Sequence, residues 1–111
     1  MGLIDTETGM MYCGDDEDIY NEILGIYVEK MGELTATLTK DLKGDDISDY
    51  VVNVHGIKSN SRNIGATDLG DFAEVMEHAG KNGDKAFLKE NHEKLLEMVK
   101  QVVAEANTIL E

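Results

Sequence analysis

The chain has 111 residues, of which 41% are hydrophobic and 30% are charged, so we expect a single globular domain. Its net charge of −13, from 10 basic and 23 acidic residues, argues against a nucleic-acid partner and against anionic membrane surfaces, because both require clustered Lys and Arg. No apolar run of about 18 residues and no basic-then-apolar leader is present, so no membrane span or export signal is predicted. The single Cys13 cannot form an internal disulfide bond, which fits a reducing compartment, and we expect a cytoplasmic protein.

Two helices are predicted in the N-terminal half of the chain. A short helix over residues 5–12 is expected to begin at the carboxylate of Asp5. After Gly14, Asp16 supplies a second carboxylate N-cap, and apolar residues then recur at steps of three and four. The sequence therefore predicts one long amphipathic helix over residues 16–43, and the absence of proline from the chain permits this length.

Three further helices are predicted, over residues 46–63, 67–81 and 84–110, with Thr67 or Asp68 as the N-cap of the second of these. The last helix places a seam of residues at alternating steps of four and three, at Leu88, His92, Leu95, Val99, Val102, Ala106 and Ile109. Such a seam is typical of a helical bundle. We therefore expect an all-α fold, an antiparallel up-down four-helix bundle with a short extra N-terminal helix, in one domain over residues 1–111.

The helix over residues 46–63 is the only place where a potential nucleophile and two cations converge. At about 100° per residue, His55 points roughly 120° away from the centre of the apolar face of this helix. Neutral imidazole is a competent nucleophile near pH 7, and a phosphoryl group on its nitrogen would be stabilised by a nearby cation. From spacing alone, a surface histidine with chance neighbours remains an open alternative. The residues on the same stripe as His55 are Val51, Val52, Lys58, Ser59 and Arg62.

Other chemistries find less support in the sequence. Di-iron bundles require Glu-x-x-His on two helices, and this motif does not occur. We expect His78 to interact with the C-terminal dipole of its helix and His92 to be packed and hydrogen-bonded, although convergence of the three histidines on a metal is an alternative. No nucleophile-elbow motif and no glycine-rich phosphate loop is present, and Cys13 has no cationic neighbours in sequence, so neither hydrolysis nor ATP binding is predicted.

The segment His55-Gly56-Ile57-Lys58-Ser59-Asn60-Ser61-Arg62-Asn63-Ile64-Gly65-Ala66 resembles the signature of histidine-containing phosphotransfer (HPt) domains. That signature is a His, an aliphatic residue two positions later, Lys at the third position, a small residue at the fourth, and Gly ten positions on. Residues 5–15 and 20–24 are also similar to the N-terminal helix and the first bundle helix of the family. The chain departs from the family pattern at Gly56, where a larger residue is commoner, and at Ser59, where Gly is commoner, but both residues are small.

The resemblance implies a phosphocarrier in a multi-step two-component phosphorelay. His55 would accept a phosphoryl group from the aspartyl phosphate of one receiver domain and pass it to another receiver. Lys58 would screen the phosphate, and Ser59 would admit the receiver. Residues of the first long helix such as Leu24 or Tyr27 would join the docking surface, whose other expected members are Val51, Val52, Gly56 and Arg62.

The resemblance also implies what the domain does not contain. We expect no cofactor and no metal site of its own, because the Mg²⁺ belongs to the partner receiver, and we expect no autonomous kinase activity. The partners would be receiver domains of response regulators or hybrid sensor kinases, and the domain itself is expected to be a monomer. A receiver-docking adaptor that does not carry phosphate is the alternative. The kinase, the receivers, the direction of phosphoryl flow, and whether the domain stands alone or is part of a hybrid kinase stay open.

Overall fold

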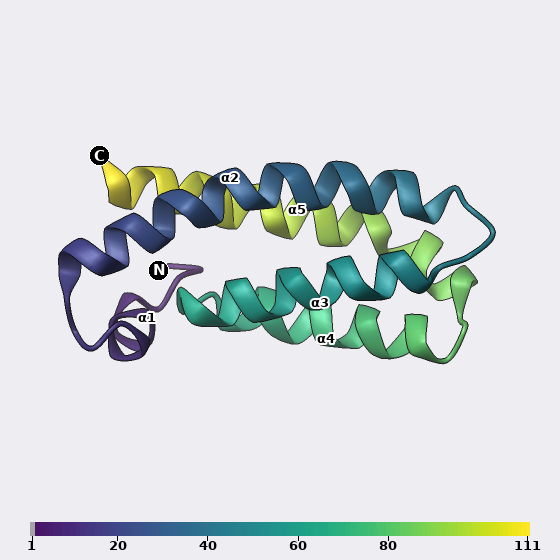
Figure 1. The fold of residues 1–111 in the computed structure, drawn as a ribbon, viewed down its shortest axis with the longest axis horizontal. Helices are drawn as coiled ribbons and strands as arrows, with labels where there is room; N and C mark the ends of the chain where they lie inside the picture. The colour runs from purple at the N-terminus through teal and green to yellow at the C-terminus, as the bar shows by residue number, and fades with distance from the viewer. Residues whose placement is uncertain (1) are drawn as a thin grey trace.

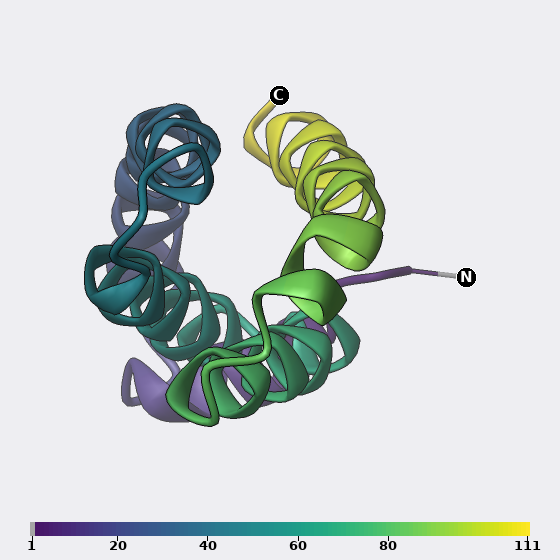
Figure 2. The same ribbon diagram turned by 90° about the vertical axis from the view of Figure 1, so that its right-hand side faces the viewer.

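The computed structural model describes residues 2–111, which form helices and no strand (Figure 1). Helices α2 to α5 run alternately up and down, each packs against the next, and α5 returns to pack against α2 (Figure 2). Helix α1 lies across one end of the bundle, against α2 and α3 (Figure 1). The predicted fold class is therefore confirmed. The helices are α1 (Thr6–Tyr12), α2 (Glu17–Leu42), α3 (Ser48–Asn63), α4 (Thr67–Lys81) and α5 (Lys85–Leu110).

Aspartate side chains begin three of the helices. Asp5, Asp16 and Asp84 are the N-caps of α1, α2 and α5, and each carboxylate accepts hydrogen bonds from backbone N–H groups of the first turn. These bonds satisfy donors that have no partner within the helix. Helix α3 begins differently, because its N-cap is Ile47, and Asp46 instead accepts a hydrogen bond from the Ser48 N–H at 2.9 Å.

The predicted side-chain cap of α4 is wrong. Neither Thr67 nor Asp68 caps the helix; its N-cap is Ala66, which has no side chain able to accept a hydrogen bond, and Thr67 is already helical. The reason lies in the turn before it. Gly65 has a φ of +92°, and the Ala66 N–H donates to the Ser61 carbonyl at 2.8 Å, so a tight turn of three residues connects α3 to α4.

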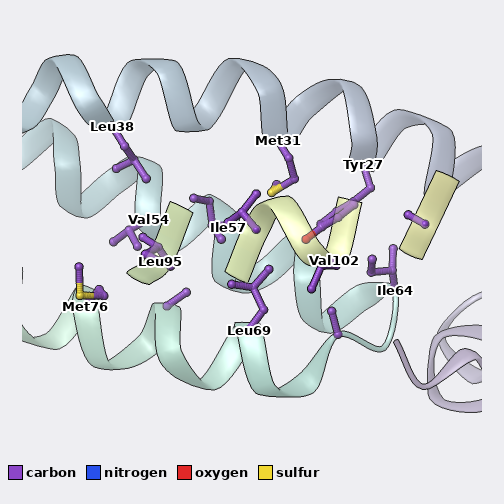
Figure 3. Close-up of a cluster of buried hydrophobic side chains, with 14 of the residues drawn as sticks. Tyr27, Met31, Leu38, Val54, Ile57, Ile64, Leu69, Met76, Leu95 and Val102 are labelled. Carbon is purple, nitrogen blue, oxygen red and sulfur yellow. The ribbon is translucent and has the colours of Figure 1, made fainter. Parts of the chain in front are cut away.

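The apolar faces of the four long helices meet in one core (Figure 3). Buried polar groups in it are paired, as expected for an interior of low dielectric constant. The hydroxyl groups of Tyr27 and Ser61 are 2.8 Å apart, and both ring nitrogens of His92 are bonded, Nδ1 to the Tyr50 hydroxyl at 3.0 Å and Nε2 to the Thr39 hydroxyl at 3.1 Å. Burial lowers the pKa of His92, so the ring is held neutral. The prediction of a packed, hydrogen-bonded His92 is confirmed.

A close contact joins the N-terminal segment to the α3–α4 turn. The Asp5 N–H donates to the Gly65 carbonyl at 2.9 Å, and a Cβ atom on Gly65 would overlap the Asp5 carbonyl oxygen. The segment before it is tied to α5, where the Glu105 carboxylate accepts the N–H groups of Leu3 and Ile4 at 2.9 and 2.6 Å. Gly65 thus meets two requirements at once, a positive φ and space for a neighbouring backbone.

None of the helices described for residues 2–111 combines the length and the apolar character that crossing a bilayer requires.

Replacing Gly65 by Ala tests the close contact. Gly83→Ala is the matched control, because Gly83 also has a positive φ, +71°, but no atom lies within 4 Å of its added Cβ. We expect Gly83→Ala to lower the free energy of unfolding by about 1–2 kcal/mol, and Gly65→Ala to lower it by more than about 3 kcal/mol, as measured by urea denaturation. Equal losses in the two variants would show that the contact with Asp5 contributes nothing.

Candidate functional site

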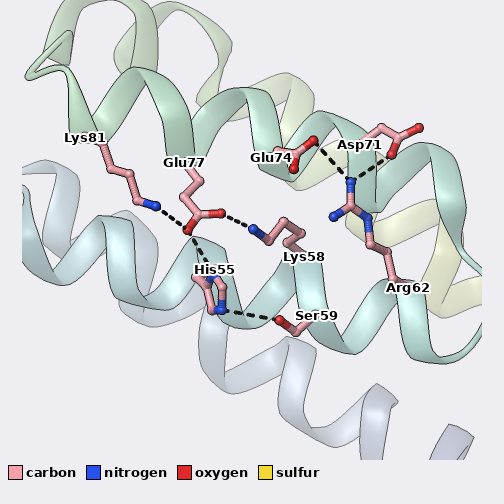
Figure 4. A network of polar contacts seen from close by, with 8 residues as sticks. All are labelled: His55, Lys58, Ser59, Arg62, Asp71, Glu74, Glu77 and Lys81. Atoms are coloured by element: carbon pink, nitrogen blue, oxygen red, sulfur yellow. Dashed lines mark hydrogen bonds and ion pairs between the residues drawn. The ribbon is translucent and has the colours of Figure 1, made fainter.

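His55 projects from α3 toward the side of the bundle on which α4 lies, and 55% of its side chain is exposed (Figure 4). Helical spacing explains this orientation. Val54 and Ile57 are fully buried and mark the core-facing side of α3, so His55, which is offset from both around the helix, points outward. A histidine that is held by the helix and still reaches solvent can meet a second molecule.

The two ring nitrogens of His55 have different surroundings. Nδ1 lies 2.8 Å from Oε2 of Glu77, whereas Nε2 has only a long contact of 3.5 Å with the Ser59 hydroxyl (Figure 4). A carboxylate can only accept, so Nδ1 carries the hydrogen and donates it. In the neutral ring the lone pair is then on Nε2, the nitrogen nearer solvent and Ser59.

Glu77 is a buried carboxylate, with 5% of its side chain exposed. Burial acts to raise its pKa, but contacts with Lys58, His55 and Lys81 outweigh burial and lower the pKa to about 2. The Lys58 ammonium lies 2.6 Å from Oε1, and the Lys81 ammonium lies 3.3 Å from Oε2. Glu77 is therefore ionised at neutral pH and is balanced by cations from both helices.

Close packing of α3 on α4 brings Glu77 to His55. A Cβ atom on Gly80 would lie 2.6 Å from a methyl group of Val51, and one on Gly70 would lie 2.6 Å from Cγ of Arg62. Two small positions on α4 thus allow the helices to approach, and Glu77 between them reaches across the interface.

The sequence reasoning missed Glu77, although a signal was present. Glu77 lies four residues after Ala73 and eight after Leu69, both of which are buried, so it continues the apolar stripe of α4. A carboxylate on a stripe that faces the core requires a hydrogen-bonding or ionic partner. This requirement was the sequence signal that marked Glu77 as a site residue.

Two of the predicted stripe residues have other roles. The Arg62 guanidinium lies 3.0 Å from Asp71 and 3.3 Å from Glu74, so it is occupied by α4 carboxylates and does not contact His55 (Figure 4). Val51 is half-buried against Gly80, and its predicted place in the docking surface stays a prediction. Val52 is 68% exposed.

The docking residues expected on the first long helix are wrong. Leu24 and Tyr27 are 0% and 2% exposed, because both belong to the core-facing stripe of α2. The exposed apolar residue of α2 that lies beside α3 is Ile26, which lines a shallow hollow with Asn60. Gly56 lies on the side of α3 that faces α2, where an added Cβ would make only an ordinary contact of 3.5 Å with Leu34.

No metal centre is formed by the part of the chain that the structure describes: no group of three or more His, Cys, Asp or Glu side chains is placed to hold an ion. His55 is bonded to Glu77, and His92 is bonded to the hydroxyl groups of Thr39 and Tyr50. His78 is exposed in the last turn of α4. His78 shares a surface hollow with Lys58, Glu77 and Lys81, but it forms no hydrogen bond to either of the other two histidines in residues 2–111.

Comparison with known protein families gives one match: the model of a family described as "Hpt domain" matches residues 22–105, well over half of the chain. The matched range contains His55, Lys58, Ser59 and Glu77. No curated protein and no solved structure matches the chain.

The hydrogen bond from His55 to Glu77 can be tested through the tautomer of the ring. We expect ¹⁵N NMR to show that the neutral form of the His55 ring carries its hydrogen on Nδ1, because the Glu77 carboxylate accepts it. In Glu77→Leu this preference should disappear, whereas in Glu74→Leu, which removes the carboxylate one turn earlier, it should persist. Nε2–H as the main form in the unmodified protein would contradict the assignment.

Proposed function

The chain belongs to the Hpt domain family, whose members perform histidine phosphotransfer in two-component phosphorelays, and from this premise we propose that His55 carries the phosphoryl group. The observation that supports this residue is the difference between its ring nitrogens, one hydrogen-bonded to a buried carboxylate and the other facing solvent. His92 is 4% exposed and has both nitrogens bonded, so it offers no free lone pair to a partner.

The geometry supports attack by Nε2. Its lone pair would attack the phosphorus of an aspartyl phosphate on a receiver domain, the N–P bond would form, and the P–O bond would break with its electron pair going to the aspartate carboxylate. The hydrogen on Nδ1 stays in place, so the phosphorylated ring becomes a cation. Glu77, ionised and 2.8 Å away, would stabilise that cation, and the reverse reaction would pass the group to a second receiver.

The residues around the ring support this reaction in different ways. Lys58, one turn from His55, would neutralise charge on the phosphoryl oxygens. Ser59 and Gly56 are small and leave space for a receiver. The exposed side chains of Val52 and Ile26 would pack against apolar residues of the receiver.

The metal chemistry of this reaction is assigned to the partner. We expect Mg²⁺ and the acidic pocket to lie in the receiver, and the Hpt domain to act without a cofactor, as a cytoplasmic monomer. The receivers could belong to response regulators or to hybrid kinases. The adaptor alternative gains no support, since a docking module would not need a histidine whose tautomer is fixed by a buried carboxylate.

Incubation with a phosphorylated receiver domain of the same organism tests the proposal. We expect an acid-labile phosphoryl label on the protein that is lost in His55→Gln and kept in His78→Gln, because His55 is the exposed histidine whose Nδ1 is bonded to the Glu77 carboxylate. The measurement is radiolabel transfer followed by gel separation. Transfer to His55→Gln, or no transfer with any receiver of the organism, would refute the assignment.

A bulky residue at position 59 tests the face of approach. Ser59→Phe should slow phosphoryl transfer by at least about tenfold, because a receiver could no longer reach Nε2 in line. Asn107→Phe, at an exposed position near the end of α5, serves as the control. Both variants should keep the thermal midpoint of the unmodified domain, and unchanged transfer by Ser59→Phe would place the receiver elsewhere.

A further inference from the structure

The Glu77 carboxylate has more cationic partners than fixing the His55 ring requires. Oε1 is fully buried and has the Lys58 ammonium as its ionic partner at 2.6 Å. Oε2 is shared between His55 Nδ1 at 2.8 Å and the Lys81 ammonium at 3.3 Å. One lysine per carboxylate would be sufficient for charge balance, so the second lysine needs a reason.

The two lysines lie on opposite sides of the carboxylate (Figure 4). Lys58 is on α3 next to Ser59, toward which Nε2 of His55 points, and 17% of its side chain is exposed. Lys81 approaches from α4 on the side away from Nε2, and 61% of its side chain is exposed (Figure 4). A phosphoryl group on Nε2 would therefore attract Lys58 before Lys81.

If Lys58 turned to the phosphoryl group, Glu77 would lose one of its two lysines. The remaining cations beside this carboxylate, which is 5% exposed, would be the phosphorylated His55 ring and Lys81, both at Oε2, and the buried Oε1 would have no ionic partner. Arg62 cannot replace Lys58 at Glu77, because it is held by Asp71 and Glu74. Among the residues that the structure describes, Lys81 is the only further lysine or arginine in contact with Glu77.

We propose that Lys81 is a positioning residue that keeps Glu77 ionised and bonded to His55 when Lys58 turns to the phosphoryl group. This inference rests on the proposed phosphorylation of His55. The sequence position of Lys81 suits this role. Lys81 follows Glu77 by four residues, the favourable order for an acidic and a basic residue on a helix. It also lies in the last turn of α4, where the helix dipole favours a cation.

The state-dependence of this role distinguishes it from ordinary stabilisation. In the unphosphorylated domain Lys58 still holds Glu77, so removing Lys81 should change little. In the phosphorylated domain Lys81 would be the one remaining lysine, so its removal would leave the His55 ring as the only cation beside Glu77. The buried carboxylate should then leave the ring more often, and the hydrogen on Nδ1 should exchange faster with water.

The experiment compares Lys81→Met with Lys89→Met, which removes an exposed lysine of α5 that forms no ion pair in residues 2–111, and with the conservative Lys81→Arg. Each protein is phosphorylated with phosphoramidate, so that no receiver is needed, and ³¹P NMR verifies the N–P bond. Proton NMR of ¹⁵N-labelled protein then gives the exchange rate of the Nδ1 hydrogen before and after phosphorylation.

We expect Lys81→Met to raise this exchange rate by about tenfold or more only in the phosphorylated form. Lys89→Met and Lys81→Arg should match the unmodified domain in both forms. Fast exchange of Lys81→Met already before phosphorylation, or no change in either form, would overturn the inference while leaving phosphorylation of His55 intact. If the unmodified domain forms no phosphohistidine at His55, the proposed function fails, and this inference fails with it.

Discussion

The hydrogen bond between His55 and the buried carboxylate of Glu77 is the interaction on which the properties of the site depend. It determines which ring nitrogen carries the hydrogen and which keeps its lone pair. It exists only because α3 and α4 pack closely at Gly70 and Gly80, and because lysines from both helices keep Glu77 ionised despite its burial. Packing, charge balance and the reactivity of one nitrogen are therefore linked in a single contact.

The two histidines of the bundle that form hydrogen bonds show how surroundings decide what an imidazole can do. His92 is enclosed by the core, and hydroxyl groups of Tyr50 and Thr39 occupy both of its nitrogens, so it is neutral and structural. His55 has one nitrogen fixed by a charge and one left to solvent. Burial and the type of hydrogen-bond partner therefore explain why His92 is structural and His55 is able to react.

The fold holds the site without contributing chemistry of its own. The contact between Asp5 and Gly65 ties the N-terminal segment to the end of α3, the helix that carries His55. Lys58 and Lys81 both contact Glu77, the buried carboxylate beside the His55 ring. A doubly charged phosphoryl group arriving at an otherwise acidic protein would meet cations at this place.

Local rules explain which features could be read from the sequence. The long helices follow from apolar spacing, the carboxylate caps at Asp5, Asp16 and Asp84 follow from their positions before helical runs, and the shared stripe of His55, Lys58 and Ser59 follows from helical geometry. These features involve residues within a turn or two of one another, so the chain by itself determines them.

Contacts between helices were decided only by the tertiary structure. Val51 packs against Gly80, where α4 comes close to α3, whereas Val52 is exposed. Leu24 and Tyr27 lie in the core. Glu77, 22 residues from His55, could not be assigned as its partner from spacing, because helical periodicity gives the face on which a residue lies but not what packs opposite that face. The sequence by itself determined the histidine and its helix; the packing of α4 on α3 decided the tautomer and the balance of charge around it.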